Sequence, residues 1–165
     1  MIQSARFPIA SLLIRAGLLL LAATPVARAQ APVIGEIVWH RADAHCAFAP
    51  ADSAGAGESG PYIFVTELAS DDQMAVERGY MRIDGLLREL ALVERKEEEA
   101  AELRVYRTFG DMPVEVTIAM RPGETRKSAQ GQVVLTRYAG TVTAAHGNSR
   151  RQVAFAGACG REAGE

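Results

Sequence analysis

Two cysteines, far apart in the sequence, place the strongest constraint on how this chain can fold. Cys46 and Cys159 are its two cysteines and are separated by 113 positions. In an exported chain they have one possible pairing, and a disulfide between them would bring the start of the domain against its end. Closing a loop of that length stabilises the folded state by about 4 to 5 kcal/mol in the chain-entropy model. We therefore expect a domain whose two ends meet.

The N-terminal segment 1–29 has the features of a cleavable signal peptide. Arg6 and Arg15 place positive charge in its first half, and the apolar run 16–23 is too short to span a bilayer comfortably. The small-x-small pattern at 27–29 is typical of a signal peptidase cleavage site. The sequence thus predicts an exported protein.

Export defines the expected domain organisation and location. Cleavage after residue 29 would leave a single β-domain over residues 30–160, followed by a disordered tail at 161–165. We expect a periplasmic or secreted protein with no transmembrane span after cleavage.

The charge of the chain is unevenly distributed. Its formal net charge is −2, and losing the three arginines of the leader would make it more acidic, which argues against nucleic acid as a partner. Residues 30–102 are predominantly acidic, whereas residues 103–161 are predominantly basic. Cross-strand pairing between the two halves is the simpler interpretation. A bipolar surface that steers a charged partner is the alternative.

The clearest local signal is a predicted β-hairpin. Asp84-Gly85 lies between the apolar stretches 79–83 and 86–93, and this residue pair suits a two-residue type I′ turn because both positions take positive φ. The segment 86–104 also has high helix propensity. A helix there is the alternative, but its apolar stripe would be broken at Glu97. We expect a strand, with an exposed turn at 97–99.

The rest of the chain reads as further strands separated by turns. Apolar alternation or β-branched content predicts strands at 30–39, 61–66, 103–107, 114–118, 133–145 and 152–158, and Pro and Gly predict loops at 49–61 and 121–131. The expected fold is all-β and mainly antiparallel, a sandwich or small barrel of seven or eight strands with one disulfide. A helix in 86–104 would make it α+β.

Parts of the mature chain resemble a set of small secreted bacterial all-β domains of unknown function. The resemblance lies in the core segment 80–85, the strand region 103–106 and the closing hairpin 138–159. It implies a β fold and carries over no activity. A single-disulfide exported β-domain is also similar in general plan to periplasmic lysozyme inhibitors.

Tests for chemistry yield one weak candidate. Ser59 and His146 lie in short strings like those of trypsin-type proteases, but their order is reversed and Pro61 breaks the nucleophile elbow. His40 and His45, near Cys46, are the best available metal ligands. Five positions apart, they would point to opposite faces of a regular strand. We predict no catalytic residues and no cofactor, and keep a small metal-binding protein or hydrolase using 40–45 as an alternative.

The predicted function is therefore binding. We expect a non-catalytic binding or accessory domain of the cell envelope, with a protein or envelope component as partner and a lysozyme-inhibitor-like role as an alternative. Aromatic and arginine side chains dominate binding hot spots. The candidate binding surface therefore consists of Arg104, Tyr106, Arg107, Arg137 and Tyr138.

Overall fold

The computed structural model describes residues 30–40, 44–53, 60–71 and 74–160. The predicted signal peptide and the predicted disordered tail lie outside these residues. Within the described ranges, no helix is long and apolar enough to cross a membrane.

The described part of the chain is all-β, as predicted. Its strands, in chain order, are β1 (Ile34–Gly35), β2 (Ile37–Val38), β3 (Cys46–Pro50), β4 (Pro61–Tyr62), β5 (Phe64–Asp71), β6 (Met74–Ile83), β7 (Leu86–Glu98), β8 (Ala101–Thr108), β9 (Glu115–Lys127), β10 (Val133–His146) and β11 (Ser149–Gly160). The strand interpretation of 86–104 is confirmed, because β7 and β8 cover it. The helix considered there is wrong.

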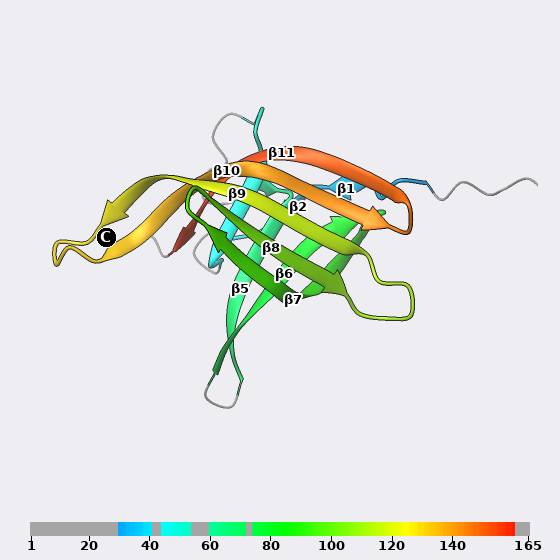
Figure 1. The fold of residues 1–165 in the computed structure, drawn as a ribbon, viewed down its shortest axis with the longest axis horizontal. Coiled ribbons are helices and arrows are strands. Elements are labelled where there is room, and N and C mark those ends of the chain that lie inside the picture. Colours follow the sequence, from blue (N-terminus) through cyan, green and yellow to red (C-terminus); the bar gives the residue numbers. More distant parts are fainter. Residues whose placement is uncertain (1–29, 41–43, 54–59, 72–73, 161–165) are drawn as a thin grey trace, which may run out of the picture.

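Eight of these strands close into an antiparallel barrel. From β5 to β11 each strand pairs with the next, and the first barrel strand, β3, pairs with both β5 and β11 (Figure 1). The small barrel is therefore the correct choice between the two predicted architectures. Closure leaves most strands with a partner on both sides, which protects the sheet from pairing with other chains.

The disulfide lies on the seam where the barrel closes. Cys46 of β3 and Cys159 of β11 are directly opposite each other in the ladder, with their Cα atoms 4.0 Å apart, and are joined by a disulfide. The predicted meeting of the two ends of the domain is confirmed.

The predicted hairpin is also confirmed. Asp84 and Gly85 have φ values of 52° and 80°, and Ile83 pairs with Leu86 across the turn. Leu86 is 57% exposed, whereas its partner Ile83 is buried. The turn lies at the end of the barrel, where the inner face opens to solvent.

The N-terminal segment covers part of the outside of the barrel. The single strand predicted at 30–39 is in fact two short strands: β1 extends the sheet beside β6, and β2 pairs with β4. A second apolar cluster forms beneath this segment from Ile37, Ala44, Ala47, Ala49, Tyr62 and Val65. The stacked rings of Trp39 and Tyr80, 5.0 Å apart, pack at its edge.

The loop predicted at 121–131 is mostly strand. β9 continues to Lys127 and pairs with β10, so the chain turns only between Lys127 and Val133. β8 pairs with β9 no further than Met120. Beyond that point β9 still pairs with β10, which also pairs with β11 as far as Leu135↔Gly160, and the β9–β10 hairpin projects from the barrel (Figure 1).

Candidate binding site

The inner face of β8 is charged rather than apolar. Glu102, Arg104 and Tyr106 occupy alternate positions and are 8%, 2% and 0% exposed. Alternate residues of a strand share one face, so all three point into the barrel. Leu103 and Val105 therefore lie on the outer face.

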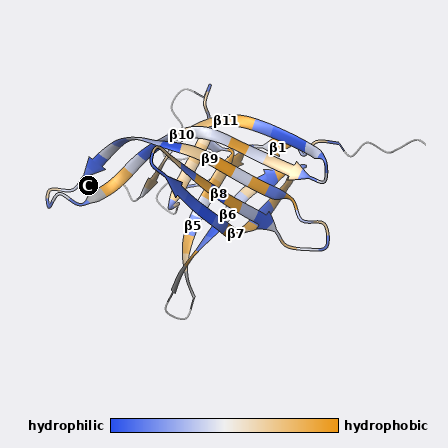
Figure 2. Ribbon diagram, viewed as in Figure 1, coloured by the Kyte–Doolittle hydropathy of each residue, from blue (hydrophilic) through white to orange (hydrophobic). Residues whose placement is uncertain are grey.

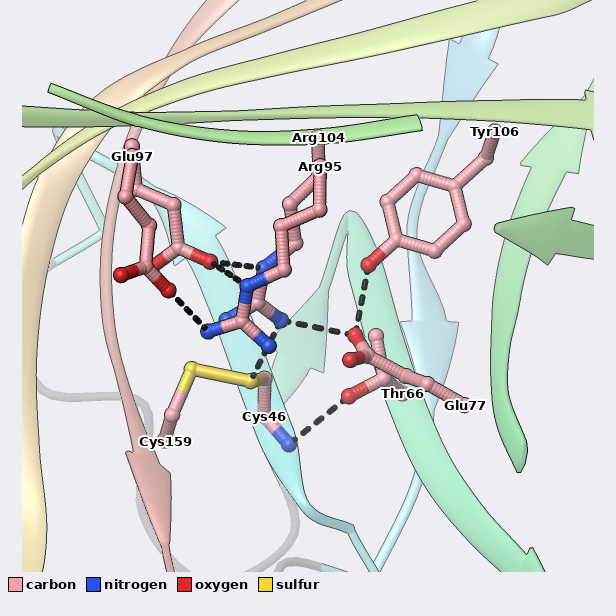
Figure 3. A network of polar contacts seen from close by, with 9 residues as sticks. Cys46, Thr66, Glu77, Arg95, Glu97, Arg104, Tyr106 and Cys159 are labelled. Carbon is pink, nitrogen blue, oxygen red and sulfur yellow. Dashed lines mark hydrogen bonds and ion pairs between the residues drawn. A yellow bond between two sulfur atoms is a disulfide. The ribbon is translucent and has the colours of Figure 1, made fainter. Parts of the chain in front are cut away.

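Arg104 is the centre of a buried polar network (Figure 3). Its Nη1 donates to Oε1 of Glu77 at 2.7 Å, and its Nε donates to Oε1 of Glu102 at 2.6 Å. Nη1 also lies 3.6 Å from Sγ of Cys46 in the disulfide. The hydroxyl of Tyr106 donates to the same Glu77 oxygen at 2.6 Å. The network thus links β6 and β8 to the closing seam.

A second row of charges from β7 extends the network outward. Across the β7–β8 ladder, Arg95 is opposite Arg104 and Glu97 is opposite Glu102. Nε of Arg95 lies 2.7 Å from Oε1 of Glu102, and its Nη2 lies 3.3 Å from Oε1 of Glu97. Like charges directly opposite each other destabilise a sheet. Here two glutamates compensate each arginine: Glu97 and Glu102 for Arg95, and Glu102 and Glu77 for Arg104.

The protonation states follow from burial and from these neighbours. Burial lowers the pKa of Arg104, but its hydrogen bond to Glu102 and the charge of Glu77 outweigh that effect and raise the pKa overall. Burial, reinforced by the charge of Glu77, raises the pKa of Tyr106. The interior therefore holds a charged guanidinium beside a neutral phenol.

The network leads to a pocket at the end of the barrel from which the β9–β10 hairpin projects. The pocket has a volume of about 240 Å³ and is lined by Arg95, Glu97, Glu98, Ala101, Glu102, Pro122 and Tyr138. Tyr138 is half-buried, and burial followed by the charge of Glu102 raises its pKa. Cavities that hold small molecules have volumes of about 300–1,000 Å³. This one suits a single side chain or a terminal group better than a whole ligand.

The structure separates the five predicted binding residues. Arg104 and Tyr106 are buried in the barrel, so they cannot form part of an outer contact surface. Tyr138 lines the pocket. Arg107 is exposed and pairs with Glu115 at 2.9 Å, and Arg137 is exposed on the projecting hairpin.

Sequence reasoning missed the glutamates and the second arginine of the network. Glu77, Arg95 and Glu102 were not singled out, and Glu97 was expected only as part of an exposed turn. The available signal was opposite charge at two-residue spacing, in Arg95/Glu97 and again in Glu102/Arg104. On a strand, that spacing places both charges on one face.

Cys46 cannot serve as a metal ligand beside His40 and His45. Cys46 is held in the disulfide and is unavailable as a thiolate ligand. Among the residues that the structure describes, no group of three or more His, Cys, Asp and Glu side chains could hold a metal ion. His40 and His45 lie on either side of residues 41–43, which fall outside the described ranges. Ser59 also falls outside these ranges.

Comparison with protein-family models, with curated proteins and with solved structures finds no match to this chain.

Proposed function

We propose that this protein is an exported, non-catalytic binding domain whose site is the pocket at the hairpin end of the barrel. The observation that carries the proposal is the charged network that forms the inner wall of the pocket. Replacing a buried ion pair with well-packed apolar residues is often neutral or stabilising. A network of two arginines and three glutamates is therefore not explained by stability alone, and a role in recognition accounts for it.

Size and charge indicate the kind of partner. A pocket of about 240 Å³ is small for a free ligand but fits one inserted side chain of a protein. Three of its lining residues are glutamates, and the one arginine among them is already paired with two of these. Together with the half-buried ring of Tyr138, this lining favours a basic group from the partner. A lysozyme is one protein that fits this description of the partner.

Export rests on the predicted leader and is supported by the disulfide. Disulfides persist in oxidising compartments and are rare in the cytosol. Intact-mass measurement on protein recovered from its host should give an N-terminus at Gln30 and no free thiol.

Site-directed photo-crosslinking tests the binding role. A photoreactive residue placed at Glu98, in the lining of the pocket, should capture one discrete protein from envelope extract. The same residue at Leu87, which is 54% exposed at the opposite end, is the matched control. Substituting Tyr138→Arg, which places a positive charge where the partner's basic group would bind, should abolish capture from position 98. Equal capture from both positions, or none from either, would show that the pocket is not the binding site.

Adding the protein to a cell-wall lysis assay tests whether its partner is a lysozyme.

A further inference from the structure

A second cavity, larger than the pocket at the hairpin end, lies on the outside of the barrel. It is a groove of about 460 Å³ over β9 and β10, and most of its lining is apolar: Ala101, Ala119, Met120, Arg121, Ala139, Gly140 and Thr141. Unlike the pocket at the hairpin end, it falls within the range of volumes that hold small molecules. Short side chains line it, so it can accept a narrow apolar group such as an alkyl chain.

Cations surround one end of this groove. Arg121 lines it and is opposite Ala139 in the β9–β10 ladder. Arg137 is two residues from Ala139 on the same strand and so shares its outer face. Leu135 lies on the same outer face, nearer the hairpin tip, and Arg126 is opposite it in the ladder. Lys127 is the next residue of β9. The groove thus runs from an apolar floor to a basic end.

These cations form no ion pair within the part of the chain that the structure describes. Arg78, Arg95, Arg104 and Arg107 all form ion pairs. Within the described residues, no ion pair involves the four cations of the projecting hairpin: Arg121, Arg126, Lys127 and Arg137. The hydrophilic end of β9 is visible as the blue segment of the projecting hairpin in Figure 2. The cross-strand interleaving expected from the uneven charge is absent here, and the positive charge faces solvent.

We propose that this groove binds a single-chain anionic amphiphile, with its alkyl chain along Ala119, Ala139 and Thr141 and its phosphate or carboxylate head on Arg121 and Arg137. Guanidinium groups bind such oxyanions through paired hydrogen bonds. An apolar groove next to cations that form no ion pair within the described residues suits a ligand with an apolar chain and an anionic head. This site shares Ala101 with the proposed binding pocket, but its two arginines do not line that pocket, so either proposal can fail without the other.

Isothermal titration calorimetry with dodecyl phosphate, kept below its micelle concentration, tests the site. Inorganic phosphate tests the head alone, and the neutral detergent dodecyl maltoside tests the chain alone. We expect the purified protein to bind dodecyl phosphate at least tenfold more tightly than either of them. The R121Q/R137Q variant should weaken binding at least tenfold. The R150Q/R151Q variant removes the same charge from exposed positions at the opposite end and should bind within twofold of the original.

A groove-filling variant separates the two parts of the site. Ala139 is exposed, so Ala139→Trp fills the groove while leaving the cations in place. It should also weaken dodecyl phosphate binding at least tenfold, with an unchanged far-UV circular dichroism spectrum. Equal binding of inorganic phosphate, or full binding by Ala139→Trp, would reduce the site to an anion-binding surface and overturn the proposal. Undiminished binding by R121Q/R137Q would overturn it as well.

Discussion

Arg104 of β8 and Glu77 of β6 form an ion pair of 2.7 Å inside the barrel, although their strands do not pair with each other. β7 lies between them in the sheet and pairs with both. The pairing of β6 with β7 extends only from Ile83↔Leu86 to Arg78↔Ala91. The ion pair therefore connects two strands at a level where the ladder between β6 and β7 has already ended.

Removing Arg104 should be strongly destabilising. Arg104→Met would leave Glu77 and Glu102 buried without their cation, and breaking a buried ion pair in this way costs about 3–5 kcal/mol. Urea denaturation should show this as a lower midpoint. Arg107→Gln is the control, since it breaks an exposed pair with Glu115 and should cost about 1 kcal/mol or less. Similar costs for the two variants would contradict a structural role of the network.

The disulfide should be a major source of stability. Reduction, or the double substitution Cys46→Ala and Cys159→Ala, should lower the free energy of unfolding by about 2–5 kcal/mol. The seam it crosses has only five paired positions, against twelve between β10 and β11. Hydrogen exchange should therefore accelerate first in β3. Uniform acceleration over all strands would show instead that the barrel opens as one unit.

Stability should decline in alkali, with Tyr106 as one cause. The folded-state pKa of Tyr106 is raised above the ordinary value of 10.0, so its stabilising contribution is complete below pH 10 and is lost as the pH rises toward the folded-state pKa. Each such tyrosine makes the free energy of unfolding fall by about 1.4 kcal/mol per pH unit in that window. Tyr106→Phe should reduce this slope between pH 10 and 11. An unchanged slope would mean that Tyr106 ionises in the folded protein.

Gly157 should resist substitution. A Cβ at this position of β11 would collide with the carbonyl oxygen of Ala47 and with the ring of Phe48, both on the neighbouring strand of the seam. Gly157→Ala should cost about 1–3 kcal/mol or more in thermal or urea denaturation. Gly123→Ala is the comparison, because the nearest atom to its Cβ would be the Arg137 oxygen at 3.6 Å, an ordinary contact. Equal tolerance at both positions would contradict the close packing of β3 on β11.

Local patterns predicted the strands, but not which side of β8 faces inward. The alternation over 103–107 was recognised, and the apolar residues Leu103 and Val105 were the natural candidates for the core. The opposite face is inside because Arg104 finds Glu77 there, on a strand 27 positions away in sequence. Such a pairing depends on the closed barrel and leaves no signal within the strand itself.

The incorrect prediction of a loop at 121–131 has a similar origin. Pro122 and Gly123 mark loops because proline lacks a ladder donor and glycine is flexible. Here they lie in β9 beyond the end of its pairing with β8, where one edge of the strand needs no donor. Whether a strand has one neighbour or two at a given residue is a property of the whole sheet, so local composition could not distinguish this edge strand from a loop.

The pairing of β3 with β11 also bears on how the molecule is made. The first barrel strand has no partner on one side until the last strand has emerged, so the polypeptide cannot complete its fold while its C-terminal residues are still being delivered. Contacts between distant parts of a chain form slowly. Such a polypeptide stays incompletely folded until its last strand is available, and an incompletely folded chain is the form that a narrow translocation channel would accept.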